Sequence, residues 1–125
     1  MNSFSPPGPL YQFDFSVVVA IYNTARFLEQ CIDSVLSQTV GFEEHIELIL
    51  VNDGSIDDTE QICLKYLQMY PNNIQYIKQN HSGVSVARNA GLHHIHGRYI
   101  NFLDSDDRWT STAFQNVAEF FRENN

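Results

Sequence analysis

The stretch FSVVVAIYN, residues 15–23, decides the fold. It is a continuous apolar run rich in β-branched residues, and it ends in the polar side chains of Tyr22 and Asn23. A run without alternation of apolar and polar residues is typical of a strand buried on both faces, as in parallel sheets. The sequence therefore predicts a central strand whose carboxyl end is marked by Tyr22 and Asn23.

Helical and strand patterns alternate through the rest of the chain. Apolar residues at helical spacing predict helices, and further buried or half-buried runs predict strands. The predicted helices span residues 24–38, 54–70, 82–97 and 113–121, and the predicted strands span residues 46–53, 74–80 and 99–104. The third helix is expected to end at Gly97. This order predicts an α/β fold, an open and mostly parallel sheet with helices on both faces in a Rossmann-like arrangement.

The length and charge limit the classes of function. The chain has 125 residues, about one domain. Residues 1–13 contain Pro6, Pro7 and Pro9 and are expected to be a flexible lead-in, with one domain over residues 14–125. The net charge of −8 argues against nucleic-acid binding and against an electrostatic hold on anionic lipid. A polyanionic ligand would need local help, most simply from a divalent cation.

Cellular location is indicated by three features. Cys31 and Cys63 fall on the apolar faces of predicted helices, which favours reduced core thiols over a disulfide. The first residues lack the pattern of a secretory signal. Apolar runs stay well short of the roughly 20 residues of a transmembrane segment. We expect a cytoplasmic protein, either free or peripheral at the inner face of the membrane.

Polar residues gather at the predicted carboxyl ends of the strands. They are Tyr22 and Asn23, then Asp53 and Gly54, and then the run Asp104–Asp107. Ligands of open α/β sheets bind at this edge, where the strand order reverses. The chain lacks both a Gly-x-Gly-x-x-Gly fingerprint and a phosphate-binding P-loop, so phosphates would be held in another way.

The acidic run offers that other way. In an extended segment Asp104 and Asp106 point to the same side, and carboxylate oxygens suit Mg²⁺ or Mn²⁺. The same run also fits a solvated turn, with Asp107 or Thr110 capping the last helix. Plain alternatives exist for other residues too, namely a turn for Asp53, packing for Tyr22 and a surface ion pair for Arg88.

Four segments together carry a family resemblance. They are VVVAIYNTARFLEQCIDSVLSQT, LILVNDGSIDDT, NHSGVSVARNAG and GRYINFLDSDDRW. In this order they resemble the nucleotide-binding half of glycosyltransferase family 2, the inverting enzymes of GT-A fold, over about residues 15–121. Asn52 departs from the aspartate commoner at its position in that family.

The resemblance implies roles for individual residues. Ala20, Tyr22 and Asp53 match positions that line the nucleobase pocket, and Asp53 matches the acid that hydrogen-bonds the uracil ring. Less regular matches near the nucleotide are Asp58 and Arg88. The Asp-x-Asp motif of the family corresponds to Asp104, Ser105 and Asp106, with Asp106 as the expected direct ligand of Mn²⁺ or Mg²⁺, Asp104 beside it and Ser105 on the sugar side.

The implied activity is inverting transfer of a sugar from a UDP-sugar to an acceptor hydroxyl on a glycan or lipid-linked molecule, as in cell-surface polysaccharide or glycolipid synthesis. The catalytic base of the family lies beyond the segment that matches here, so we expect the base beyond Asn125 and a chain truncated before its acceptor-binding half. An open sheet of this kind is also expected to form homodimers through exposed apolar surface.

Two other functions fit parts of the sequence. One is a non-catalytic nucleotide-binding or assembly module of the same fold. The other takes FLDSDD as the nucleophile loop of a haloacid-dehalogenase-like phosphatase. In that family the motif follows the first strand of the core, whereas here it follows the fourth predicted strand.

Overall fold

Four parallel strands form one sheet in the order β3-β2-β1-β4. The computed structural model describes residues 11–124, without the side chains of residues 121, 122 and 124, so most of the expected lead-in lies outside the described residues. The strands are β1 (Phe13–Ile21), β2 (Ile46–Asn52), β3 (Ile74–Lys78) and β4 (Gly97–Phe102). In the register of the sheet, Ile21 lies opposite Asn52 and Val18 opposite Phe102. The predicted strand over residues 15–23 is thus the central β1, with neighbours on both sides.

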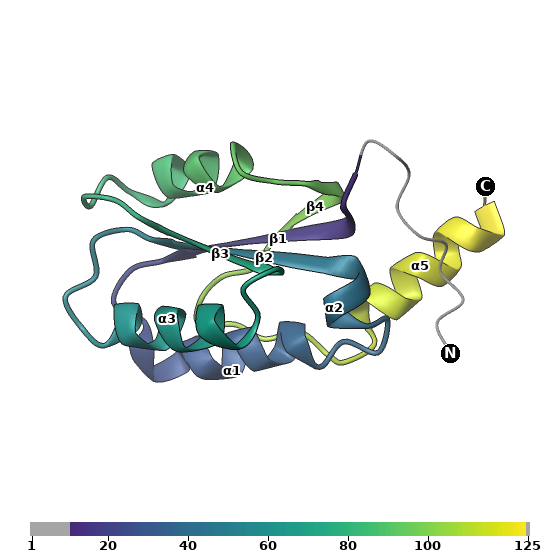
Figure 1. Ribbon diagram of the computed structural model, residues 1–125, viewed down its shortest axis with the longest axis horizontal. Helices are drawn as coiled ribbons and strands as arrows, with labels where there is room; N and C mark the ends of the chain where they lie inside the picture. The colour runs from purple at the N-terminus through teal and green to yellow at the C-terminus, as the bar shows by residue number, and fades with distance from the viewer. Residues whose placement is uncertain (1–10, 125) are drawn as a thin grey trace.

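The helices lie on both faces of this sheet (Figure 1). They are α1 (Ala25–Leu36), α2 (Phe42–His45), α3 (Thr59–Met69), α4 (Val84–Leu92) and α5 (Ala113–Asn124). The chain runs from β1 through β2 to β3 in one direction and then places β4 on the other side of β1. Right-handed connections therefore put α1 and α3 on one face and α4 on the other, as Figure 1 shows. The predicted fold class is confirmed.

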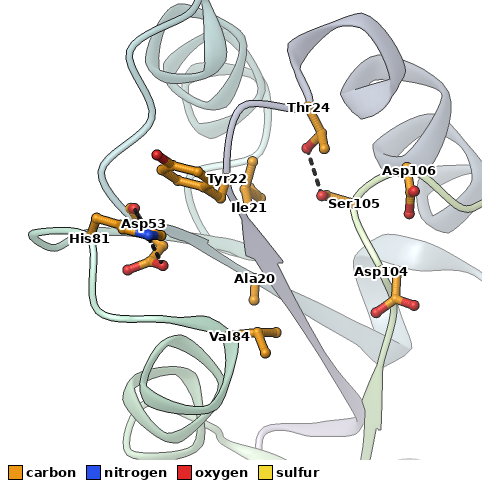
Figure 2. A pocket seen from close by; sticks show the side chains of 10 residues that line it. All are labelled: Ala20, Ile21, Tyr22, Thr24, Asp53, His81, Val84, Asp104, Ser105 and Asp106. Atoms are coloured by element: carbon orange, nitrogen blue, oxygen red, sulfur yellow. Dashed lines mark hydrogen bonds and ion pairs between the residues drawn. The ribbon is translucent and has the colours of Figure 1, made fainter.

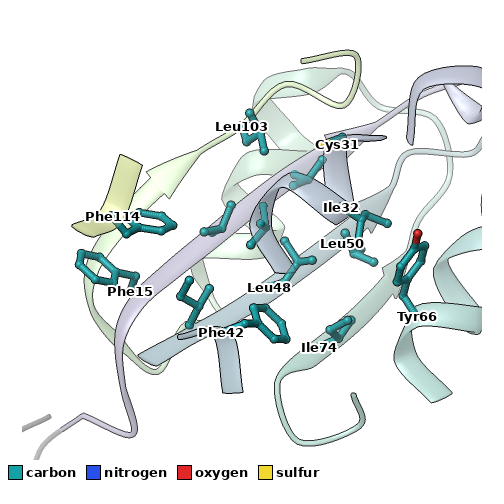
Figure 3. Close-up of a cluster of buried hydrophobic side chains, with 14 of the residues drawn as sticks. Phe15, Cys31, Ile32, Phe42, Leu48, Leu50, Tyr66, Ile74, Leu103 and Phe114 are labelled. Carbon is teal, nitrogen blue, oxygen red and sulfur yellow. The ribbon is translucent and has the colours of Figure 1, made fainter. Parts of the chain in front are cut away.

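Alternate side chains of the central strands pack into two apolar clusters. Phe15, Val17, Val19 and Ile21 face α1 and α3, where the larger cluster lies (Figure 3), and Val18 faces α4. Phe114 at the start of α5 stacks on Phe15 with ring centroids 4.4 Å apart. This contact fixes α5 beside the amino-terminal end of β1, so the opposite, carboxyl-terminal edge of the sheet stays open for a ligand.

Both cysteines are buried and free, which confirms the expectation of reduced core thiols. Burial raises the pKa of Cys31 and of Cys63 to about 12, so both remain thiols at neutral pH. Among the described residues, the helices are all too short or too polar to cross a bilayer.

The structure corrects the end of the third predicted helix, which the sequence pattern extends to Gly97. Helix α4 ends at Leu92, and Gly97 is the first residue of β4 rather than a helix terminus. A Cβ atom at Gly97 would lie 2.4 Å from Ser16 Oγ and 2.7 Å from the carbonyl carbon of Phe15. Glycine is needed there because the backbones of β4 and β1 approach closely, not because a helix ends. The short helix α2 was not predicted.

Candidate functional site

A pocket of about 320 Å³ opens at the carboxyl ends of β1 and β4 (Figure 2). This is the point where the strand order reverses, the usual ligand position in open α/β sheets. The pocket is lined by Ala20, Ile21, Tyr22, Thr24, Asp53, His81, Val84, Asp104, Ser105 and Asp106. Residues that follow all four strands are thus brought to one cavity, and the sequence predicted those after β1, β2 and β4.

Asp53 stands directly after β2 and is 3% exposed. Its Oδ1 accepts hydrogen bonds from Gln79 Nε2 at 2.9 Å and Ser82 N at 2.8 Å, and its Oδ2 from His81 Nδ1 at 3.0 Å and Gly83 N at 3.0 Å. Burial alone would raise the pKa of Asp53, but these hydrogen bonds and the charge of His81 hold it below its ordinary value. The carboxylate therefore anchors the loop that leads into α4.

Tyr22 forms the aromatic wall of the pocket. Its ring stacks on the His81 ring with centroids 4.0 Å apart and planes at 23°. The next residue, Asn23, adopts a left-handed backbone conformation with φ of 53°. Its amide donates to Ser55 Oγ at 2.9 Å, and its side-chain Oδ1 accepts from Ile56 N at 2.8 Å. The loops after β1 and β2 are thereby joined beside the Tyr22 ring.

The acidic residues after β4 form a turn on the other side of the pocket. The amide of Asp107 donates to the carbonyl of Asp104 at 2.9 Å, which closes the turn. Carboxylate oxygens of Asp104, Asp106 and Asp107 all lie within 4.8 Å of one another, and all three side chains are exposed. Arg88 Nη2 donates to Asp104 Oδ1 at 3.1 Å, so α4 delivers this guanidinium to the same turn. The three carboxylates can approach a common cation from one side.

Ser105 points away from the acids that flank it. It is 7% exposed, and its hydroxyl lies 2.6 Å from Thr24 Oγ1 (Figure 2). This contact joins the acidic turn to the loop that carries Tyr22.

Helix α1 holds the segment that follows the acidic turn. Ser34 Oγ accepts from the amide of Trp109 at 3.1 Å, Gln38 Nε2 donates to the carbonyl of Thr110 at 2.7 Å, and Gln38 Oε1 accepts from the amide of Phe114 at 3.0 Å. Capping of α5 by Thr110 or Asp107 was one alternative for this run. Thr110 does contact α5, but through its backbone carbonyl, which accepts from Ala113 N at 3.2 Å.

Of the residues expected from the sequence, all but one line this pocket or contact a residue that lines it. Ala20, Tyr22, Asp53, Asp104, Ser105 and Asp106 line the pocket, and Arg88 touches it through Asp104. Asp58 lies elsewhere, in a shallow groove between α1 and α3 that also contains Glu29 and Lys65.

Four lining residues were not expected, namely Ile21, Thr24, His81 and Val84. His81 and Val84 follow β3, and the carboxyl end of β3 meets the same edge as those of the other strands. Applying the strand-end rule to the third strand as well would have found them.

Comparison with known proteins agrees with this geometry. The family model described as Glycosyl transferase family 2 matches residues 16–125. The minor teichoic acid biosynthesis proteins GgaB and GgaA of Bacillus subtilis (strain 168) are 52% and 49% identical to the chain over 113 and 109 residues, which are 90% and 86% of its length.

A solved structure has a similar fold. The crystal structure of S. aureus TarS 1-349 in complex with UDP-GlcNAc has a TM-score of 0.81 and 29% sequence identity over 89% of the chain. The chain spans 12% of GgaB, 24% of GgaA and 32% of that TarS chain. On the family match and on these identities, the chain belongs to glycosyltransferase family 2.

Proposed function

We propose that this chain is the donor-binding part of a glycosyltransferase that transfers a sugar, with inversion, from a UDP-sugar to an acceptor hydroxyl. The observation that carries the proposal is one pocket with an aromatic and hydrogen-bonding wall, Tyr22 and Asp53, facing a turn of three acids. A nucleoside diphosphate has two parts that match these two sides. Its base can stack and hydrogen-bond at the wall, and its diphosphate can share a cation with the acids. The UDP-GlcNAc complex of TarS supports UDP as the nucleotide.

The base side of the donor would lie over Ala20, Tyr22 and Asp53. These residues line the pocket at the ends of β1 and β2. The Tyr22 ring offers a stacking face, and Asp53, whose pKa is lowered, is an ionised acceptor at neutral pH. We assign Ser105 to the sugar side and Arg88 to the diphosphate, and the contact of Arg88 with Asp104 supports the assignment of Arg88.

The acidic turn suits a divalent cation. Its donors are carboxylate oxygens that lie within 4.8 Å of one another, and Mg²⁺ and Mn²⁺ prefer such oxygen ligands. We assign Asp106 and Asp104 to this cation, and its chemistry when bound is to offset the charge of the diphosphate leaving group. In a chain of net charge −8, diphosphate binding would otherwise meet repulsion from these acids.

The acceptor hydroxyl attacks the anomeric carbon, and the bond to the diphosphate breaks on the opposite face. The proton of that hydroxyl goes to a carboxylate other than Asp53, Asp104 and Asp106, because these acids of the pocket already serve the donor. The acceptor is proposed to be a glycan or a lipid-linked molecule, in line with the teichoic acid biosynthesis named for GgaA and GgaB. The free buried cysteines suit a reducing compartment such as the cytoplasm.

Thermal melting with UDP tests the proposal. We expect UDP to raise the melting temperature by several degrees in the presence of Mn²⁺ or Mg²⁺, since a ligand at about 100 times its Kd adds about 2.7 kcal/mol. Asp106→Asn should abolish the shift, because it removes a ligand charge at an exposed position without disturbing the core. Glu43→Gln, which removes one exposed acid on α2, is the matched control and should keep the shift. A UDP effect that survives both a chelator and Asp106→Asn would contradict the metal assignment.

A further inference from the structure

We propose that the His81 side chain occupies the nucleobase position when the pocket is empty, and that it has to swing out before a nucleotide can bind. This inference rests on the proposed function, because it concerns the base side of the same pocket. His81 therefore sets the affinity for the donor by competing with it.

The contacts of His81 are those of a base. Its planar ring stacks on Tyr22 at 4.0 Å, and its Nδ1 lies 3.0 Å from Asp53 Oδ2. An ionised carboxylate can only accept, so Nδ1 carries the hydrogen and donates it. A pyrimidine such as uracil would also present a flat ring for stacking and a ring N–H for a carboxylate. In Figure 2 the Tyr22 ring lies over the His81 side chain at the pocket wall.

Asp53 has no acceptor position to spare while His81 is in place. A carboxylate offers about four lone-pair positions, and the four hydrogen bonds from Gln79, His81, Ser82 and Gly83 use them. A base that approaches Asp53 therefore has to share an oxygen or displace one of these donors. Two of the four donors are backbone amides, and the Gln79 side chain lies on the other oxygen from His81.

His81 is the donor that can leave without moving the loop. Its side chain is 56% exposed. The backbone beside it is fixed independently, because Ser82 N and Gly83 N bind Asp53, and because a Cβ atom on Gly54 would lie only 2.7 Å from His81 N. A side-chain rotation alone then frees the face of Tyr22 and one acceptor of Asp53 together. Such rotations are fast for exposed side chains.

Competition of this kind lowers apparent affinity by the fraction of molecules in which His81 is out of the way. Removing the ring should therefore tighten nucleotide binding. In His81→Ala we expect UDP to bind about three- to tenfold more tightly in the presence of Mn²⁺, which is the scale of one aromatic stacking contact. His81→Asn keeps a donor for Asp53 but has no aromatic ring, so its affinity should fall between the two.

The experiment is calorimetric titration of UDP into the parent chain, His81→Ala, His81→Asn and His93→Ala. His93 is an exposed histidine at the end of α4, away from the pocket lining, and its variant should match the parent. Weaker or equal binding by His81→Ala, with normal binding by the parent, would overturn the inference and leave the proposed function intact. Absence of binding by the parent and by every variant would overturn both.

Proton NMR of the histidine rings follows the position of His81 directly, first without nucleotide and then with UDP. Stacking on Tyr22 should shift the His81 ring protons upfield in the empty chain, and Tyr22→Ala should remove that shift. Addition of UDP should move the His81 signals to the positions of an unstacked histidine. An empty chain without the upfield shift, or a shift that persists at saturating UDP, would contradict the displacement of His81.

Discussion

Asp53 shows how one residue can serve the structure and the site together. Its carboxylate is almost fully buried, and its charge is stabilised by backbone and side-chain donors from residues 79–83. Those donors orient the loop that presents His81 and the start of α4 to the pocket. The same carboxylate faces the proposed base position, so its effect on binding and its effect on stability have to be separated by experiment.

The stability lost in Asp53→Asn, measured without nucleotide, isolates the structural role of Asp53 from its role in binding. The asparagine amide would point a donor at backbone N–H groups, and at least one buried amide would lose its acceptor. We expect the free energy of unfolding to fall by about 2–3 kcal/mol, the usual cost of losing hydrogen bonds to a charged group. Urea denaturation without metal measures this, with Asp107→Asn as the control. Because Asp107 is exposed among other acids, its variant should change stability by less than about 0.5 kcal/mol. Equal effects of the two substitutions would argue against the anchoring role.

For single residues, the sequence predicted the position in the fold better than it predicted the hydrogen-bond partners. Tyr22, Asp53 and Asp104 could be placed at strand ends from the pattern alone, because parallel strands bring their carboxyl ends to one edge. The partners of Asp53 are 26 to 30 residues away along the chain. Which loop folds over a given strand end depends on the tertiary packing of α4, and neither charge nor spacing encodes it locally.

At the scale of elements, one carboxylate ties two helices together. Asp57 Oδ1 accepts from Thr59 N at 3.1 Å and from Thr59 Oγ1 at 2.6 Å, at the start of α3. Its Oδ2 accepts from Ala25 N at 3.0 Å, at the start of α1. Asp58 precedes Thr59 directly but makes no capping bond with its side chain. Asp57 and Asp58 stand side by side before this helix in the sequence, and only the folded loop shows which of the two caps it.

Asp57→Ala should therefore destabilise the chain while Asp58→Ala should not. Loss of a helix-capping side chain costs about 0.5–2 kcal/mol, and here the start of α1 loses an acceptor as well, so we expect the upper part of that range for Asp57→Ala. Thermal melting of both variants measures the difference. Hydrogen exchange at the amide of Ala25 adds a local readout, because that amide should exchange faster only in the Asp57 variant. Similar melting temperatures for the two variants would contradict the double cap.

A second element-scale prediction concerns the contact between α4 and the sheet. A Cβ atom at Gly91 would lie 2.4 Å from Val18 Cγ1, so the helix backbone rests directly on β1. Gly91→Ala should force α4 away from the sheet and lower stability by about 1–3 kcal/mol, the usual cost of overpacking. This outweighs the gain of up to about 1 kcal/mol that alanine brings over glycine in a helix. Ala90→Gly should also lower stability, by that smaller amount plus the packing of one methyl group against the smaller cluster. Urea denaturation measures both variants, and a stabilised Gly91→Ala would contradict the close contact.

The architecture of the whole molecule could be predicted because the buried strands and the helices between them are long sequence patterns. Short buried runs rich in β-branched residues, such as residues 15–21 and 46–51, are typical of strands covered on both faces, and the helices between them favour the parallel order. The end of α4 and the role of Gly97 could not be predicted in this way. Glycine before an apolar run fits both a helix end and a close strand contact, and only the approach of Ser16 and Phe15 decides between them.

The response of the whole molecule to acid follows from its shifted carboxyl groups. Burial opposes ionisation of Asp53 and Asp57, but their hydrogen bonds outweigh it and hold both pKa values below the ordinary 3.8. Groups of this kind stabilise the folded state fully above the unfolded pKa, and the stabilisation is lost as pH falls through the lower folded pKa. Asp14 acts in the opposite direction, because burial raises its pKa despite its contact with His45. Its contribution is present at low pH and is lost as pH rises.

We therefore expect stability to fall below about pH 4 and the fall to be shallower in Asp57→Asn, which has no carboxyl group to protonate at that position. Acidification also removes net negative charge, which favours the folded state, so the difference between variant and parent is the quantity to measure. Urea denaturation at intervals from pH 6 to pH 3 gives that difference. It should be largest at pH 6 and should shrink toward pH 3, as the parent loses what the variant never had. A constant difference over this range would mean that Asp57 contributes through packing and neutral hydrogen bonds rather than through its charge.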